Sequence, residues 1–333
     1  MNSNKIAVVI LNWNGKELLA QFLPKVLAFS KEATVYVADN ASADDSIDYI
    51  KKNFPEVQLI QNAENGGYAK GYNDALPGVS EEIFCLLNSD IEVTENWLAP
   101  ILAEFESNTE TAIIQPKILD FKQQTHFEYA GAAGGFIDKY GYPFCRGRIF
   151  HTLEEDKNQY NDSKEIFWAS GACLFIRKSV FHELNGFDED FFAHQEEIDL
   201  CWRAFNKGYK ATYIAESVVY HVGGATLDSA NPKKTYLNFR NSLCMLAKNL
   251  PKGKLVPIIF LRLVLDGIAG VQFLTKLQFK HAFAILKAHF HFYARLPKMV
   301  KKRGEKQQKQ YFGHKSIVYS YFIKGKKQYS DLS

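Results

Sequence analysis

Short apolar runs alternate with amphipathic segments along the first ninety residues. Four runs are continuously apolar or rich in Val and Ile, as buried strands are: residues 6–11, 34–38, 57–60 and 83–87. The segments between them have helical spacing: residues 16–29, 44–53 and 68–76. This order predicts an α/β fold with a Rossmann-like, mainly parallel sheet flanked by helices. Ligands are expected at the carboxyl ends of its strands.

The pattern changes twice further along the chain. Residues 120–165 mix five glycines with scattered aromatics, which predicts irregular structure with short strands and a mobile substrate loop. A strand at 167–176 and a helix at 196–207 follow. After residue 250 the chain is rich in Leu, Ile, Phe and Lys. We therefore expect a catalytic domain over residues 1–250 and a helical, basic region over 251–333.

Composition and charge restrict the class of protein, its cellular compartment and its partners. Hydrophobic residues make up 47% of the chain, as in globular proteins, and the five cysteines include no CxxC pair. A disulfide framework or zinc site is not expected, and a reducing cytoplasm fits. Residues 255–275 come nearest to a membrane span, but Arg262 and Asp266 interrupt them, so no ordinary transmembrane helix is expected. Residues 251–333 hold 17 Lys and Arg against 3 Asp and Glu, which favours phosphate-bearing partners.

Polar residues follow three of the predicted strands. Asn12 follows the first, Asp39 the second, and Asn88-Ser89-Asp90 the fourth. A carboxylate at Asp90 suits Mg²⁺, which takes one or two protein carboxylates and further oxygens from phosphates and water. The carboxylate of Asp39 is suited to accept a hydrogen bond from the ring NH of a pyrimidine base. Taken singly, both aspartates fit ordinary Asx turns equally well.

Three later segments also carry candidate chemistry. Gly66 and Gly67 begin a helix, where backbone amides can approach a ligand, although neither a P-loop nor GxGxxG is present. Glu196 and Glu197 begin another helix. One of them could serve as a general base, or both could simply cap the first turn of the helix. His221 follows an apolar strand. It could bind a metal or a diphosphate, or it could be a core residue whose hydrogen bonds are satisfied within the protein.

In chain order these segments resemble the motifs of the inverting glycosyltransferase family 2, which has the GT-A fold. The resemblance covers about residues 5–250. The matched positions are Asn12 after the opening strand; Asp39, Asn40, Ser42 and Asp44 for DNxSxD; Asn65, Gly67, Ala69, Gly71 and Asn73 for NxGxAxGxN; Asn88 and Asp90 for DxD; Glu196, Glu197, Asp199 and Arg203 for EDxDLxxR; and Arg240-Asn241 for an RN pair.

Two positions depart from the family's pattern. Asn88 replaces the first Asp of DxD, which is similar to the NxD form of the rhamnosyltransferase-like branch. Glu197 stands where the family has its catalytic Asp, so the base is Glu197 or the adjacent Glu196, and we favour Glu197.

The resemblance implies transfer of a sugar from a nucleotide-diphosphate sugar, with dTDP-rhamnose as the leading donor, to a glycan or polyprenyl-linked acceptor in cell-surface polysaccharide synthesis. A divalent ion, Mg²⁺ or Mn²⁺, is expected at Asp90 with help from His221. The implied donor-binding residues are Asn12, Asp39, Asn65, Gly67, Asn73, Asn88 and Asp90, and the implied acceptor or diphosphate side is Asp199, Arg203 and Arg240.

The basic region has helix-compatible spacing over residues 252–302, with Arg262 and Asp266 placed for an i,i+4 pair. A polybasic run follows, from Lys298 to Lys309. This combination predicts binding to an anionic membrane surface, at about 1 kcal/mol per basic residue, and a peripheral location at the inner face of the cell membrane. The alternative is a helical subdomain packed on the catalytic domain or in a homodimer.

Two other functions are alternatives on the sequence. A sugar nucleotidyltransferase carries a Gly-rich, basic loop after its first strand, whereas residues 12–16 read NWNGK. A nucleic-acid-binding protein could use the basic tail, but the chain has no recognised module for it, and no nucleic-acid partner is expected.

Overall fold

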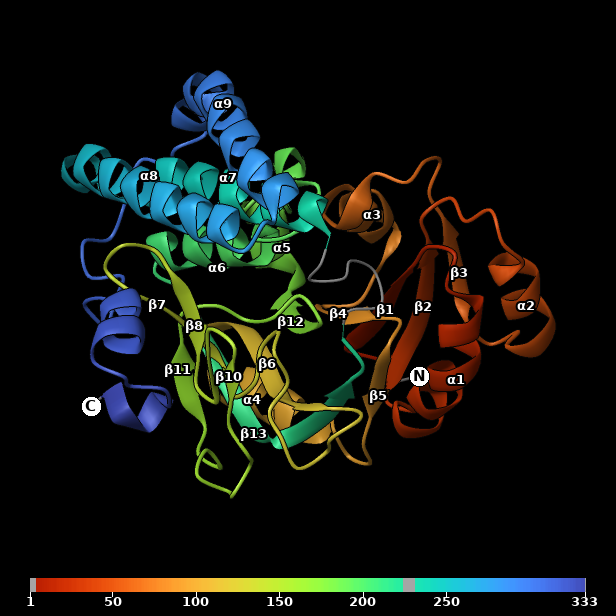
Figure 1. Cartoon of the computed structure of the whole chain (residues 1–333). Coiled ribbons are helices and arrows are strands. Elements are labelled where there is room, and N and C mark those ends of the chain that lie inside the picture. The colour runs from red at the N-terminus through yellow and green to blue at the C-terminus, as the bar shows by residue number, and fades with distance from the viewer. Residues whose placement is uncertain (1–3, 224–230, 333) are drawn as a thin grey trace.

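The computed structural model describes residues 4–223 and 231–332 (Figure 1). Its central sheet begins with four parallel strands, in the order β4 (Ile83–Asn88), β1 (Ile6–Asn12), β2 (Ala33–Asp39) and β3 (Gln58–Gln61). Between them run α1 (Lys16–Phe29), α2 (Ser46–Asn53) and α3 (Gly67–Ala75). The predicted elements of this half are confirmed, and their bounds differ by two residues at most.

Beyond β4 the sheet becomes mixed. β12 (Cys173–Arg177) runs antiparallel to both β4 and β6 (Thr111–Asp120), and β13 (Lys210–His221) runs parallel to β6. β11 (Lys164–Ile166) and β5 (Ile91–Val93) both pair antiparallel with β13. The strand predicted at 167–176 begins only at Cys173, because the backbone of Phe167 and Trp168 bonds Gly135 of a second sheet instead.

That second sheet occupies the glycine-rich stretch. It has the order β10 (Thr152–Leu153), β9 (Arg148–Ile149), β8 (Pro143–Cys145) and β7 (Gly135–Ile137). The prediction of irregular structure with short strands is confirmed. Two turns at the end of the chain, η3 (Tyr319–Ile323) and η4 (Tyr329–Leu332), pack on this sheet, where Tyr329 lies 5.3 Å from the ring of Phe136.

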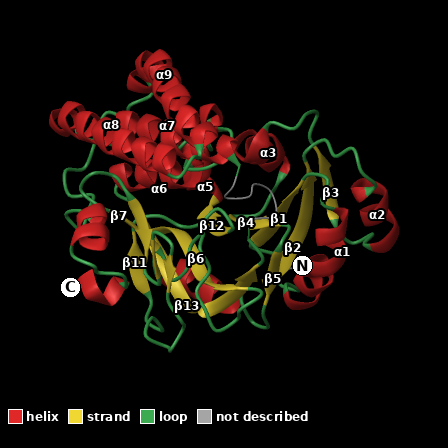
Figure 2. Cartoon of the chain, in the orientation of Figure 1, coloured by secondary structure: helices red, strands yellow, loops and turns green. Residues whose placement is uncertain are grey.

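Helices cover both faces of the central sheet (Figure 2). Successive residues of β1 point to opposite sides, so Val8 belongs to one apolar core and Val9 to the other. α1 and α4 (Ala99–Ser107) close the first core. The second is closed by α3, α5 (Lys178–Glu183), α6 (Glu196–Lys207) and α7 (Pro232–Asn249). The helix predicted at 196–207 is confirmed at both ends.

The basic region forms a hairpin of α8 (Lys252–Thr275) and α9 (Phe279–Lys301) beside α7 (Figure 1). Ile258 and Phe292 of the hairpin share the second core with the rest of the chain. The expected Arg262–Asp266 pair is wrong. Arg262 donates instead to the carbonyl oxygens of Tyr140 and Gly141, and Asp266 pairs with His289 at 3.2 Å.

By length and composition alone, α8 could cross a membrane. Arg262 and Asp266 are too few to lower its hydropathy below that of a span, contrary to the expectation from the sequence. All five cysteines are free and buried.

Candidate functional site

The carboxyl ends of β1 and β2 carry a fixed polar pair. Asn12 and Asp39 are neighbours in the sheet register, and Asn12 Nδ2 donates to Asp39 Oδ1 at 3.0 Å. The other Asp39 oxygen accepts from the backbone N–H of Ser42 at 2.9 Å. Asn12 Oδ1 is buried without a hydrogen-bond partner, and a Cβ added at Gly15 would lie 2.4 Å from it. This edge therefore requires glycine at position 15 and leaves one buried acceptor open.

The start of α3 touches the loop that precedes α6. Asn65 Oδ1 accepts from Gly67 N at 3.0 Å, which fixes the turn into α3. Gly67 has φ +77°, and a Cβ there would lie 2.6 Å from the carbonyl oxygen of Phe192. At the other end of α3, Asn73 exchanges two hydrogen bonds with the backbone of Phe187, both 2.9 Å long. Of the three predicted donor-side residues, Gly67 and Asn73 thus join α3 to residues 187–192, and Asn65 fixes the turn that precedes Gly67.

Asp90 lies in the turn between β4 and β5, two residues after Asn88 at the end of β4. Its Oδ1 is 3.2 Å from Nε2 of His221 at the end of β13. The second ring nitrogen, Nδ1, lies 3.3 Å from Glu128. Burial disfavours a charged ring, but the two carboxylates outweigh it and raise the pKa of His221 to about 10. The structure thus brings the two predicted metal ligands together.

A carboxylate and an imidazole can both hold a divalent ion, but only a neutral imidazole does so, and an ion here would therefore displace the proton between His221 and Asp90. Within residues 4–223 and 231–332, no group of three or more His, Cys, Asp or Glu side chains is arranged to hold a metal. One carboxylate and one imidazole remain, with Glu128 on the far ring nitrogen, where such a carboxylate fixes the orientation of a ligating histidine. Any further ligands would have to come from a bound diphosphate or water.

Glu128 gave no signal in the sequence, because it stands in the irregular stretch, far from every motif.

Glu196 and Glu197 occupy the first turn of α6. One carboxylate oxygen of each is buried without a hydrogen-bond partner. Burial raises the pKa of Glu197 to about 7, against backbone hydrogen bonds at the helix start that lower it. Burial and the neighbouring Glu197 charge raise the pKa of Glu196 well above its usual range. Glu197 is therefore the carboxylate that ionises near neutral pH and can take a proton there.

The loop before α6 has a strained backbone. Phe192, His194 and Gln195 have φ of 66°, 70° and 74°, in the left-handed region that non-glycine residues avoid. Such residues cost about 1–3 kcal/mol each and persist only where their surroundings hold them. A strained turn thus leads directly into the pair of glutamates.

Two side chains of α7 hold this loop. Asn241 Nδ2 lies 3.0, 2.9 and 2.7 Å from the carbonyl oxygens of Phe191, Ala193 and His194. Arg240 donates to the carbonyl oxygen of Phe191 at 2.9 Å and orients Asn241 through its Nε. Arg240, expected on the acceptor or diphosphate side, thus fastens the loop that leads into α6.

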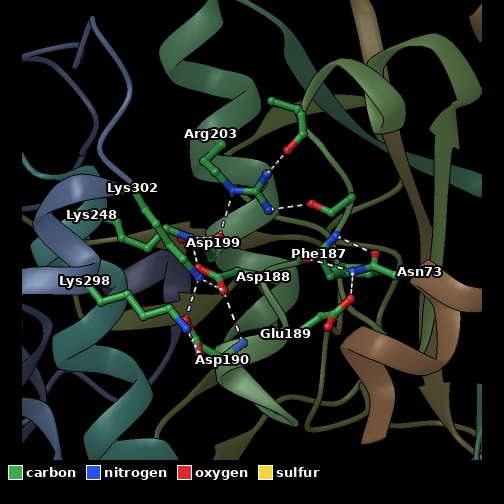
Figure 3. Close-up of polar contacts among 12 residues, drawn as sticks. Asn73, Phe187, Asp188, Glu189, Asp190, Asp199, Arg203, Lys248, Lys298 and Lys302 are labelled. Atoms are coloured by element: carbon green, nitrogen blue, oxygen red, sulfur yellow. Dashed lines mark hydrogen bonds and ion pairs between the residues drawn. The ribbon is translucent and has the colours of Figure 1, made fainter. Parts of the chain in front are cut away.

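Asp199 and Arg203 lie one to two turns into α6, in a buried ion network (Figure 3). Asp199 is fully buried and accepts from Arg203 and Lys248, both at 2.8 Å, and from Asn249 at 2.8 Å. Arg203 also donates to the carbonyl oxygens of Leu184 and Gly186. In this structure both predicted acceptor-side residues bind protein partners, so they anchor α6.

The same network reaches the loop before α6. Lys248 lies 2.6 Å from Asp188, and Lys302 pairs with both Asp188 and Asp190. Burial disfavours ionisation of Asp188, but the two lysines outweigh it and lower its pKa to about 2. This network could not be found from sequence, because its members come from four separate segments of the chain.

A parallel half with polar residues at its strand ends, continued by a mixed half, is the arrangement of the GT-A fold. Residues 7–184 match the model of glycosyl transferase family 2, more than half of the chain. The chain belongs to this family and is a glycosyltransferase that uses nucleotide sugars.

Among its relatives is the N-acetylglucosaminyl-diphospho-decaprenol L-rhamnosyltransferase of Mycobacterium tuberculosis. It is 24% identical over 235 residues, which cover 65% of this chain and 75% of that protein. The structure of S. aureus TarS 1-349 in complex with UDP-GlcNAc has a TM-score of 0.58 at 15% identity, over 90% of this chain and 84% of that chain. The structure of GalNAc-T7 with UDP, GalNAc and Mn²⁺ also has a TM-score of 0.58, at 17% identity, over 74% of this chain and 48% of that longer chain. The two structures share the fold.

Proposed function

We propose that Glu197 is the general base of an inverting sugar transfer. It removes the proton from an acceptor hydroxyl, whose oxygen attacks the anomeric carbon from the side opposite the nucleotide. The observation that carries this proposal is the unpartnered carboxylate oxygen of Glu197, with a pKa of about 7, at the end of a strained and clamped loop. Glu196, whose pKa burial and the neighbouring Glu197 charge raise well above its usual range, is the second candidate for the role.

The donor is proposed to bind along the carboxyl ends of β1, β2 and β4. Asp39 and Asn12 would face the base and ribose, and Asn88 and Asp90 the diphosphate. Asp90 and His221 would hold the divalent ion, Mg²⁺ or Mn²⁺, which neutralises charge on the leaving diphosphate. Their 3.2 Å separation and the Mn²⁺ in the GalNAc-T7 complex support this assignment.

For the donor sugar and acceptor we propose L-rhamnose from dTDP-rhamnose and a polyprenyl-diphosphate glycan. The name of the mycobacterial relative supports both. Such an acceptor would place the enzyme at the inner face of the cell membrane, with residues 1–250 catalysing transfer and residues 251–333 associating with the membrane. Asp199, Arg203 and Arg240 would then support the acceptor side by holding α6 and its loop.

The test uses the purified chain with a panel of UDP-, GDP- and dTDP-sugars and Mn²⁺ or Mg²⁺. Thermal stabilisation and slow donor hydrolysis identify the donor, and dTDP-rhamnose is expected to give both. Glu197→Gln should abolish transfer while keeping the nucleotide-induced stabilisation, and Asp90→Ala should lose the metal-dependent part. Glu216→Gln, on an exposed position of β13, is the matched control. Near-normal turnover by Glu197→Gln would remove its assigned role.

A further inference from the structure

The hairpin of α8 and α9 presents an unusually apolar outer surface. Phe260 on α8 is 68% exposed and Phe290 on α9 is 73% exposed. Soluble proteins rarely expose large apolar side chains in one contiguous group. We call these residues the hairpin surface: Val256, Phe260, Val264, Ile268, Val271, Leu274, Leu277, Phe279, Phe283, Leu286, Phe290 and Tyr293.

The charges of α8 point the opposite way. Arg262 lies 3.7 Å from the ring centre of Tyr142 and is bonded to backbone carbonyls beside it, and Asp266 faces His289 of α9. Both are buried, so α8 shows no charged side chain outward between Lys254 and Lys276. A helix facing water on that side would have the reverse arrangement. Its outer face is suited to an apolar medium.

Basic residues border this surface. Residues 252–302 contain ten Lys and Arg but a single acidic residue, the buried Asp266. On α9, Lys280 and Lys287 are exposed and flank the apolar stripe, and Lys276 stands at the hairpin turn. An anionic lipid surface complements this border. A second copy of the chain would bring a like-charged border and no acidic residue to pair with it, which disfavours self-association.

Three of the six basic residues of the polybasic tail are engaged within the protein. Lys298 lies 2.7 Å from Asp190, and Lys302 lies 2.6 Å from the same carboxylate and also pairs with Asp188. Arg303 donates to backbone carbonyls at the end of α7. These contacts fasten the end of α9 to the loop that leads to Glu197. The tail, on which the sequence-based prediction of membrane binding relied, thus has a structural use.

We propose that the hairpin surface is the membrane-docking site of this enzyme, and that it lies flat in the interface of an anionic bilayer. α8 has the length of a span, but its middle is bonded through Arg262 to residues 140–141 of the catalytic body, so it cannot leave that body to cross the bilayer. Only the use of this dock, to reach a lipid-linked acceptor, rests on the proposed function.

The experiment measures flotation of the full-length chain with vesicles of phosphatidylcholine containing 30% phosphatidylglycerol. Phe260→Ser/Phe290→Ser should weaken binding about 100-fold, because each exposed phenylalanine that enters the interface contributes about tenfold or more. Leu153→Ser/Ile323→Ser removes two exposed apolar residues elsewhere and should bind as wild type. Washing with alkaline carbonate should release the wild-type chain.

A tail variant separates the two sources of binding. Lys306→Gln/Lys309→Gln should change vesicle binding by about twofold at most, whereas a tail-driven interaction would lose roughly 30-fold. A loss of that size in the tail variant, with Phe260→Ser/Phe290→Ser unaffected, overturns the proposal. Retention after carbonate overturns the flat orientation. A wild-type dimer that Phe260→Ser/Phe290→Ser converts to a monomer, with no vesicle binding, shows that the surface is a subunit interface.

Donor hydrolysis is measured on the same samples. Vesicle binding by a chain that hydrolyses no nucleotide sugar would remove the proposed function and leave the dock intact. Donor hydrolysis by a chain that does not bind vesicles would remove the membrane dock and leave the proposed sugar transfer intact.

Discussion

Asn241 should control the rate of transfer without touching a substrate. The change is Asn241→Leu, which keeps the size of the buried side chain and removes its amide. The two amide protons serve the carbonyl oxygens of Phe191, Ala193 and His194, at 3.0, 2.9 and 2.7 Å. Each buried acceptor left without its donor costs about 1–3 kcal/mol. Arg240 still donates to the Phe191 carbonyl, so two acceptors lose their donor and stability should fall by about 2–6 kcal/mol.

The larger consequence concerns the loop. Its residues at positions 192, 194 and 195 hold left-handed backbone that costs about 1–3 kcal/mol each, and this strain relaxes once the clamp is gone. Relaxation moves Glu197, and a misplacement of about 1 Å lowers a rate by roughly 100-fold. The kcat of transfer or of donor hydrolysis should fall by that factor, with KM for the donor changed little.

The control is Ile258→Ala, a buried truncation on α8 that leaves the hydrogen bonds of the loop in place and costs about 2–5 kcal/mol. Urea unfolding establishes that the two variants are equally destabilised, and kcat is then compared well below either unfolding midpoint. If Asn241→Leu turns over within about twofold of Ile258→Ala, the clamp has no part in placing the base and the reasoning fails.

Three further outcomes follow from the same geometry. Since burial raises the pKa of Glu197 to about 7, kcat/KM should climb between about pH 6 and pH 8 and then level off, and a profile that is flat over this range contradicts a Glu197 base. Lys248→Met leaves Asp188 and Asp199 buried without their shared lysine, so urea unfolding at pH 7 should show a loss of about 3–5 kcal/mol. Lys248 and Lys302 lower the pKa of Asp188 from 3.8 to about 2 against the effect of burial, so this stabilisation is complete above about pH 4 and is lost as the pH falls toward 2; an equal gap between variant and wild type at pH 2 and pH 7 would be inconsistent with that. Gly67→Ala should lower thermal stability by about 1–3 kcal/mol, because its Cβ would meet the Phe192 carbonyl at 2.6 Å, whereas Gly78→Ala, with open space around it, should not, and equal melting temperatures would refute the close approach.

The sequence alone determined the elements whose signal is local. The four parallel strands and the helix at 196–207 could be predicted because the spacing of apolar residues and the presence of turn residues are local signals, read within a few positions of the sequence. Motif order was sufficient for the family, which the match over residues 7–184 confirms. Motif order also led to Asp90, and the position after an apolar strand led to His221; the structure places the two side chains 3.2 Å apart. Nothing local signalled that β12 inserts antiparallel between β4 and β6, because that pairing joins residues far apart in the chain.

Only the tertiary structure decided what the charged residues contact. Asp199 and Arg203 belong to a motif, yet their partners include Lys248 and the carbonyl oxygens of residues 184 and 186. Arg262 and Asp266 are spaced for each other, yet each turns to another element. Lys302 is part of a basic run in the sequence but pairs with two aspartates. The physical reason is that a buried charge needs a partner, and which partner is within reach depends on packing rather than on sequence spacing.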